Sequence, residues 1–487
     1  MGKVISPASA RSYFVAMIPS RNSTQLKWLA VLGVALIVMV VPHPAAVPPL
    51  GWQLLAVFAA TMVGLIVQPL PGGAMVFLGV CVLAVTGIVP MGVALAGYSE
   101  SVVWLVLAAF FISRAMIKTG LGRRLALLFV KQLGRTTLGV GYALSLTDMV
   151  LAMIIPSNTA RSGGVIFPIG KSICEAYDSR PGETARRMGS YLMMQIYQCD
   201  VIVCAMFLTG QASNALIASF AKSSAGVELS YTKWLVAGIA PGLVAFALMP
   251  LLLFRIHPPE IKSTPAAREI ATAELDRIGP MTRAEKIMLA VFALVLTLWL
   301  TKAFHTIDYS AVAMLGVACL LISNVLTFDD LLNERSAWDV FLWYGGLVQL
   351  AKLLNENGVT KWFASVAAGA VGGWPWWAAL IILVLIYLYA HYGFASITAH
   401  VTAMYVPFLA VCIALGAPPL LTVLVLAHAS NLGAALTHYG TTPAPIFFGA
   451  GYVSQKEWWR VGFLASAMTL VIFGTIGPLW WKLLGWW

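Results

Sequence analysis

The sequence has few charged residues for its length. Asp, Glu, Lys and Arg make up only 10% of the 487 residues, whereas hydrophobic residues make up 60% and the mean hydropathy is +0.86. Soluble domains contain about 25% charged residues. The longest polar stretch, residues 257–286, is too short to bury a core of its own. The composition therefore excludes a soluble globular protein and leaves no room for a separate catalytic domain outside the membrane.

Several chemical signatures are also missing. The six cysteines form no CxxC pair, and the HExxH and GxSxG motifs are absent. A segment resembles a phosphate-binding loop, but five residues instead of four separate Gly164 from Gly170. The formal net charge is +11, yet the basic residues lie between apolar runs and form no single patch. We therefore expect no enzyme, no metal, no cofactor and no nucleic-acid partner.

Long apolar runs dominate the sequence. Roughly 14 stretches approach the length of about 20 residues that crosses a bilayer, among them Trp52–Val67, Val102–Ile117 and Trp234–Phe254. They predict an all-α polytopic membrane protein, surrounded by lipid. Basic residues before the first run, such as Lys27, place the N-terminus in the cytoplasm and favour the cell's inner (plasma) membrane. An organellar targeting arm in residues 1–24 is the alternative.

Internal similarity divides the chain into two halves. The segment that starts at Ser101 resembles the one that starts at Ser336, and each contains an apolar span, a basic residue, a glycine and an amphipathic piece. Transporters are often built from such repeats. An odd number of crossings per repeat would invert the second repeat relative to the first. The predicted parts are an N-terminal arm with a first transmembrane helix (1–50), a first repeat (51–256), a charged linker (257–286) and a second repeat (287–487).

Each repeat contains two points where glycine, proline and short polar residues interrupt an apolar span. Broken helices at membrane depth occur where they line a wet cavity, and a helix that starts after a break presents N–H groups to an anion. The alternatives are a proline-kinked helix or a flexible turn. We name them the first break (Ser157–Thr159), second break (Gly210–Asn214), third break (Ser396–Thr402) and fourth break (Gly440–Pro443). The predicted substrate-binding residues are Ser157, Asn158, Thr159, Gly210, Gln211, Ser396, Thr398, Thr441, Thr442 and Pro443.

Ionisable residues also fall inside the apolar runs, where they are costly and usually functional. Arg161 and His400 lie at matching places just beyond the first break and within the third, so we predict that they compensate the charge of a bound anion. Asp148 and Asp200 either couple ion movement to transport or form a buried pair with a basic residue.

Three motifs resemble a known family. They are "PSNTARSGGVIFPI", "HYGFASITAHVTAMY" and "YGTTPAPIFFGAGYVSQKEWWRVGF". They are similar to the divalent anion:sodium symporter (DASS) family, most of all to its exchanger branch. That branch includes bacterial citrate/succinate and tartrate/succinate antiporters and the plastid 2-oxoglutarate/malate translocator. The resemblance implies a homodimer of two inverted repeats with re-entrant hairpins, in which a transport domain moves as an elevator along a scaffold domain.

The resemblance also assigns roles to residues. In the family the Ser-Asn-Thr motif binds a substrate carboxylate and flanks the first sodium site, and it matches Ser157, Asn158 and Thr159. The third break lacks the family's asparagine, and the closing Thr-Pro-Pro-Asn motif ends here in Pro443-Ala444. These departures weaken the match at the second sodium site.

The expected function is exchange of C4–C6 di- or tricarboxylates, such as succinate, malate, 2-oxoglutarate, citrate or tartrate, without sodium. A fixed cation at Arg161 or His400 cannot dissociate, so the empty carrier would keep a positive charge and cross the membrane poorly. The alternatives are a sodium-coupled dicarboxylate symporter and, remotely, a membrane-embedded enzyme.

Overall fold

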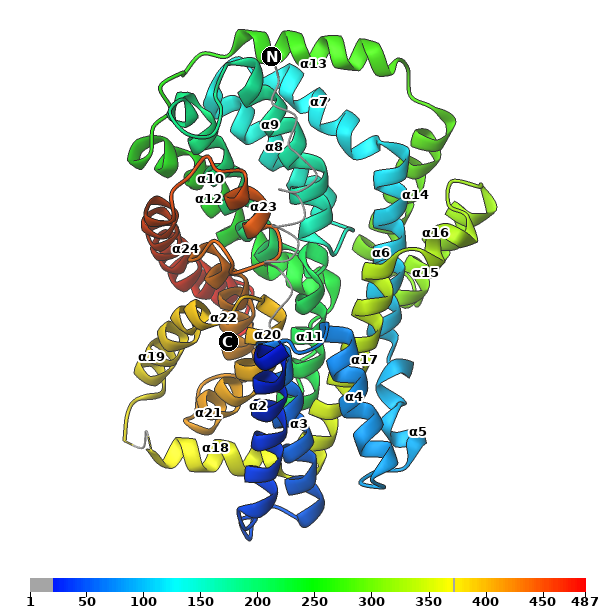
Figure 1. Ribbon diagram of the computed structural model, residues 1–487, viewed down its shortest axis with the longest axis vertical. Helices are drawn as coiled ribbons and strands as arrows, with labels where there is room; N and C mark the ends of the chain where they lie inside the picture. The colour runs from blue at the N-terminus through cyan, green and yellow to red at the C-terminus, as the bar shows by residue number, and fades with distance from the viewer. Residues whose placement is uncertain (1–20, 371–372) are drawn as a thin grey trace.

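The structure is a computed structural model that describes residues 21–370 and 373–487. Within this part of the chain the regular elements are helices (Figure 1). Six of the described helices are long and apolar enough to cross a membrane, and further apolar helices of 10–17 residues accompany them. The prediction of an all-α multi-pass protein is confirmed.

The helices of the two repeats follow each other in the same order. Helix α2 (Arg21–Val40) precedes the first repeat. The first repeat consists of α3 (Pro49–Val67), α4 (Gly72–Val85), α5 (Met91–Ala94), α6 (Ser101–Thr119), α7 (Leu121–Leu133), α8 (Thr137–Ala152), α9 (Phe167–Ala176), α10 (Gly189–Met206), α11 (Ala212–Ala225) and α12 (Tyr231–Ile256). The second consists of α14 (Arg283–Leu300), α15 (Tyr309–Ile322), α16 (Phe328–Leu332), α17 (Arg335–Glu356), α18 (Val359–Ala370), α19 (Trp376–Tyr389), α20 (Ile397–His400), α21 (Val406–Ala414), α22 (Pro419–Leu432), α23 (Ala444–Gly449) and α24 (Gln455–Leu483).

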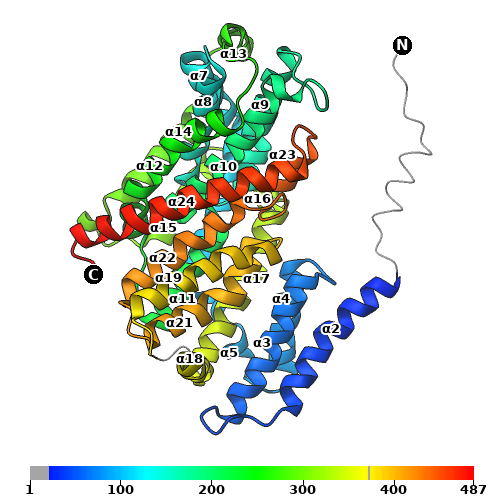
Figure 2. The same cartoon turned by 90° about the vertical axis from the view of Figure 1, so that its left-hand side faces the viewer.

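The amphipathic helices that follow the glycine turns lie at opposite ends of the molecule, whereas other equivalent helices, such as α12 and α24, pack on each other. Helix α7 lies at one end and its counterpart α18 at the other, in both views (Figures 1 and 2). The helix packing is reciprocal, because α4 packs on α17 while α15 packs on α6. This is the arrangement expected of two inverted repeats, which the family resemblance implied.

A glycine ends the same helix in each repeat. Gly120 separates α6 from α7 with a φ of 78°, and Gly358 separates α17 from α18 with a φ of 76°. Residues with a Cβ atom adopt this left-handed conformation only at a cost, so glycine is the usual residue at such helix ends. The glycines noted in the sequence repeat therefore set the sharp turns into α7 and α18.

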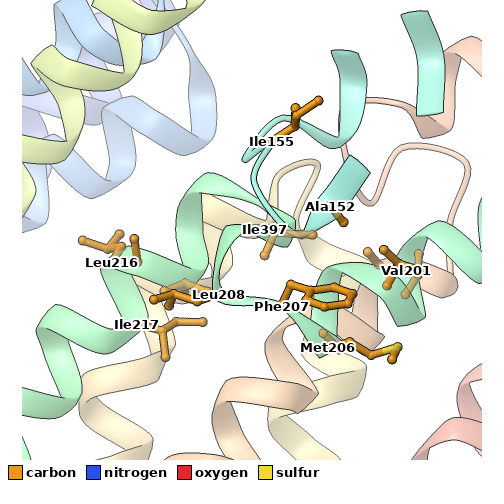
Figure 3. Packing of buried hydrophobic residues seen from close by; sticks show 14 of the residues in the cluster. Ala152, Ile155, Val201, Met206, Phe207, Leu208, Leu216, Ile217 and Ile397 are labelled. Carbon is orange, nitrogen blue, oxygen red and sulfur yellow. The ribbon is translucent and has the colours of Figure 1, made fainter. Parts of the chain in front are cut away.

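The surface and the interior both suit a lipid environment. Leu32 and Leu36 of α2 are exposed, as expected of a surface that faces acyl chains. Inside, Ile397 of the second repeat packs among apolar residues of the first, including Ile155 and Leu208 (Figure 3). The tight interior places the breaks of the two repeats beside one another.

The predicted charged linker contains a helix and is attached to the first repeat by a buried ion pair. Helix α13 (Pro265–Ile278) packs on α7. Arg124 of α7 donates from Nε to Glu285 Oε1 at 2.6 Å and from Nη2 to Oε2 at 3.1 Å. Glu285 also forms a capping box with Thr282, which starts α14. The second repeat therefore begins at a point fixed by α7.

We predict that Arg124→Ala lowers the free energy of unfolding by about 3–5 kcal/mol, because it leaves Glu285 buried without its partner. The neighbouring Arg123, which forms an exposed pair with Glu274, is the matched control. Arg123→Ala should cost less than about 1 kcal/mol. Thermal unfolding of purified protein in detergent measures both, and equal melting temperatures for the two variants would contradict the prediction.

Candidate functional site

The first and third breaks have the same local structure. Helix α8 ends before Pro156, and the chain returns to a helical path as a π-helix at Thr159–Ile166. In the second repeat, α20 leads into a π-helix at Val401–Tyr405. π-Helices are rare and are found frequently at functional sites. The sequence prediction that the helices are interrupted at these two places is confirmed.

Glycine is required at the second and fourth breaks by close backbone contact. A Cβ atom on Gly210 would lie 2.7 Å from the carbonyl oxygen of Cys204, and one on Gly440 would lie 2.9 Å from that of Ala434. Such contacts are shorter than real Cβ atoms make. The two glycines therefore let each chain segment fold back closely on the segment that precedes it.

A cavity of about 560 Å³ lies where the four breaks meet. One wall carries the polar residues of the breaks and the other consists mainly of apolar residues of α3, α6 and α17, such as Phe110 and Trp343. Most of the predicted substrate-binding residues line it together. They are Ser157, Asn158, Thr159, Gln211, Ser396, Thr398, Thr441 and Thr442.

Hydrogen bonds between the repeats hold the breaks together. Asn158 Nδ2 donates to Thr441 Oγ1 at 3.1 Å, and the hydroxyl groups of Thr159 and Thr442 share a hydrogen bond. Gln211 donates to the side chain of Asn431 on α22. The cavity is therefore built jointly by both repeats, and its polar wall contains neutral hydrogen-bonding groups.

Arg161 lies behind this wall and is fully buried. Its Nε donates to Asp148 Oδ1 at 3.0 Å and its Nη2 donates to Asp200 Oδ1 at 3.3 Å. Its Nη1 donates to the carbonyl oxygens of Ile155 and Gly210, both at 2.7 Å. A single guanidinium thus joins α8, α10, the first break and the second break.

The second repeat has an uncharged counterpart. The interval of 13 residues between Asp148 and Arg161 is the interval between Tyr387 and His400. His400 donates to the carbonyl of Tyr387 at 3.0 Å, and the Tyr387 hydroxyl contacts Ser430 Oγ at 2.8 Å. The carbonyl oxygen of Gly440 in the fourth break is bound by His391 and not by His400. His391 Nε2 donates to it at 2.7 Å.

The structure corrects the predicted role of Arg161 and His400. Neither residue lines the cavity, and both are fully buried. The guanidinium of Arg161 is paired with the carboxyl groups of both Asp148 and Asp200, so the expected uncompensated positive charge on an empty carrier is wrong for this residue. Of the two alternatives left open for the acids, the structure supports a buried pair with a basic residue. Two further predicted residues, Gly210 and Pro443, also lie outside the cavity lining.

Sequence reasoning missed the residues of the opposite wall. Gln68, Arg335, Ser336 and Asp339 line the cavity from the ends of α3 and α17. Arg335, Ser336 and Asp339 belong to the first turns of α17, where no glycine or proline interrupts the sequence, so the pattern that identified the breaks gave no signal there. The one signal in the sequence is that Arg335 and Asp339 are charged residues at the start of an apolar span that is repeated in the chain.

Family comparison assigns nearly the whole chain to one family model. Residues 22–487 match the family described as "Sodium:sulfate symporter transmembrane region". The chain is 46% identical over 460 residues to YflS of Bacillus subtilis, covering 94% of this chain and 96% of that protein, whose name provisionally describes it as a malate transporter. It is 42% identical over 475 residues to the chloroplastic dicarboxylate transporter 1 of Arabidopsis thaliana, covering 97% of this chain and 85% of that protein.

A solved structure has a similar fold. The crystal structure of the YdaH transporter of Alcanivorax borkumensis matches with a TM-score of 0.53 at 13% sequence identity, covering 95% of this chain and 99% of that chain. At this low identity the likeness concerns the fold alone.

We predict that Arg161→Gln destabilises the protein by about 3–5 kcal/mol, because two buried carboxylates lose their only cation among the described residues. Asp200→Asn is the matched control, since it leaves one carboxylate for one guanidinium, and it should cost less than about 1.5 kcal/mol. Melting temperatures in detergent distinguish the variants. If Arg161→Gln melts like the wild type, the guanidinium does not hold the breaks.

Proposed function

Because this chain belongs to the sodium:sulfate symporter family, a family of membrane transporters, we propose that it exchanges C4–C6 di- or tricarboxylates across a membrane. The observation that carries the proposal is the cavity of about 560 Å³ where polar groups from four breaks converge. Hydroxyl and amide groups donate hydrogen bonds to carboxylates. The printed names of the relatives point to dicarboxylates, and succinate and malate are the substrates to examine first.

The position of Arg161 supports transport without sodium. In many transporters the carbonyl groups freed by a helix break coordinate the coupling cation. Here the carbonyls of Ile155 and Gly210 already accept hydrogen bonds from Arg161 Nη1. In the second repeat the carbonyl of Gly440 accepts from His391. These carbonyls already accept hydrogen bonds, so they have less capacity to coordinate a sodium ion. The guanidinium of Arg161 takes the place that a dissociable cation would have.

The two walls of the cavity support exchange over net transport. The polar groups of Ser157, Gln211 and Thr398 face a wall that contains Leu65, Phe110, Val340, Trp343 and Leu347. Moving polar groups without a ligand along a largely apolar surface removes them from water and costs free energy. A bound carboxylate satisfies these groups, so the loaded carrier crosses more easily than the empty one. This argument replaces the uncompensated charge on Arg161 that the sequence suggested.

The cellular setting follows from the relatives and the family resemblance. We place the chain in the plasma membrane, as a multi-pass protein like its bacterial relative, with the N-terminus in the cytoplasm. The assembly is a homodimer whose breaks move together as an elevator-type transport domain. Cross-linking of the purified protein in a bilayer would test the dimer.

The proposal predicts counterflow in sodium-free proteoliposomes. Labelled succinate should enter vesicles loaded with succinate or malate at least about 10-fold faster than empty vesicles, because the loaded carrier crosses most easily. Net uptake driven by a sodium gradient would instead identify a sodium-coupled symporter. If no dicarboxylate or tricarboxylate accelerates exchange, the proposed function is wrong.

We also predict that Asn158→Ala weakens succinate binding by roughly 10- to 150-fold, since one hydrogen bond to a charged group contributes about 1.5–3 kcal/mol. Asn357→Ala is the control, because its side chain bonds within α17, to Leu353, and does not line the cavity. Exchange rates at several succinate concentrations give the two KM values. A KM for Asn158→Ala equal to that of the control would remove Asn158 from the site.

A further inference from the structure

The wall of the cavity that faces the breaks carries two charged residues, Arg335 and Asp339. No other charged residue is among those that line the cavity in the described part of the chain. Both belong to the first two turns of α17, and they lie one helical turn apart on the face that continues with Trp343. The net charge of the lining is therefore zero, although the proposed substrates carry two or three negative charges.

Asp339 is directed to another partner. Its Oδ1 accepts a hydrogen bond from the backbone N–H of Gly73 at 3.1 Å, at the start of α4. A carboxylate at a helix N-terminus is stabilised by the unpaired N–H groups and the helix dipole. A Cβ atom on Gly73 would lie 2.5 Å from this carboxylate, so glycine allows the contact. The negative charge of Asp339 is thus partly compensated by α4.

Arg335 has no such partner. It is the first residue of α17 and is exposed to the cavity. Within residues 21–370 and 373–487, no carboxylate lies within ion-pair distance of its guanidinium, although Asp339 is four residues away. A cation at a helix N-terminus is disfavoured by the dipole. Because the helix dipole disfavours this guanidinium and no carboxylate in the described part of the chain pairs with it, an anion that enters the cavity would stabilise it.

We propose that Arg335 binds the carboxylate of the substrate that points away from the breaks. This inference rests on the proposed function and deepens it. Asn158, Thr159 and their neighbours hold one carboxylate with neutral donors, and Arg335 pairs with the other across the cavity. A guanidinium matches a carboxylate with two parallel N–H donors. Arg335 therefore selects acids with a carboxylate at both ends.

The repeats make this contact one-sided. Alignment of Ser336 with Ser101 places Glu100 at the position that corresponds to Arg335. Glu100 lies 3.6 Å from Lys352 and is the residue before α6. Helix α6 begins after α5, and α17 begins after α16. In both views α16 lies higher than α5, so α6 and α17 start at different heights in the molecule (Figures 1 and 2). Substrate that enters from the side of Arg335 meets an unpaired cation, whereas on the other side Lys352 is already paired with Glu100.

The test compares succinate with its monomethyl ester, which lacks the second negative charge. In the wild type the KM for succinate should be lower than the KM for the ester. Arg335→Gln should raise the KM for succinate by roughly 10- to 100-fold and leave the KM for the ester nearly unchanged. Arg335→Lys should keep part of the preference, because it retains the charge but not the fork of donors. Arg283→Gln is the matched control, since Arg283 is the exposed first residue of α14 and lies away from the cavity.

The outcomes separate this inference from the proposed function. If the wild type exchanges no dicarboxylate, the proposed function fails first. If the wild type exchanges succinate, an equal effect of Arg335→Gln on both substrates, or no effect, would overturn the inference. Vesicles with one orientation add a second readout, because the KM should rise on one side of the membrane only.

A second variant covers the case in which Arg335→Gln does not assemble. Asp339→Asn keeps an oxygen for the Gly73 amide but removes the negative charge. It should lower the KM for succinate and leave the KM for the ester nearly unchanged. An unchanged KM for succinate in this variant would also contradict a substrate carboxylate beside Arg335.

Discussion

The site depends on one buried guanidinium. Arg161 joins Asp148 and Asp200 and also binds the carbonyl groups of Ile155 and Gly210. A broken helix exposes carbonyl groups that hydrocarbon cannot satisfy, and a buried cation needs an anion. Here the guanidinium of Arg161 donates to the exposed carbonyl groups, and the two carboxylates supply the anions that the buried cation needs. The first and second breaks therefore keep their shape inside an apolar environment. Their neutral hydrogen-bond donors can then face the cavity, because Arg161 and not a ligand stabilises the backbone.

The second repeat solves the same problem without charge. Tyr387, His400 and Ser430 take the places of the ionised residues, and His391 binds the carbonyl of Gly440. Hydrogen bonds such as that from Asn158 to Thr441 then join the repeats. A symmetric scaffold thus carries a chemically asymmetric site. One repeat contains a buried cluster of a guanidinium and two carboxylates, and the other has a tyrosine, a serine and histidines in its place.

Much of the fold could be predicted from the sequence, and so could the residues that form the polar wall of the cavity. The resemblance to divalent anion:sodium symporters is confirmed at the level of the family, while the exchanger branch stays a prediction. The breaks were visible because proline, glycine and short polar residues stand out in an apolar chain. The opposite wall was not, since Arg335 and Asp339 follow no interruption. The role proposed for Arg335 rests only on its place in the cavity lining.

By itself the sequence determined the helices, the two repeats and the places where helices break, because these follow from local hydropathy and backbone chemistry. It also predicted that Arg161 and His400 compensate the charge of a bound anion, and neither lines the cavity. Only the tertiary structure decided that Asp148 and Asp200 pair with Arg161 and that His400 binds the Tyr387 carbonyl. Electrostatic interactions fall off with distance and depend on burial. The charge that a residue offers to a ligand therefore depends on partners that lie far away in the chain.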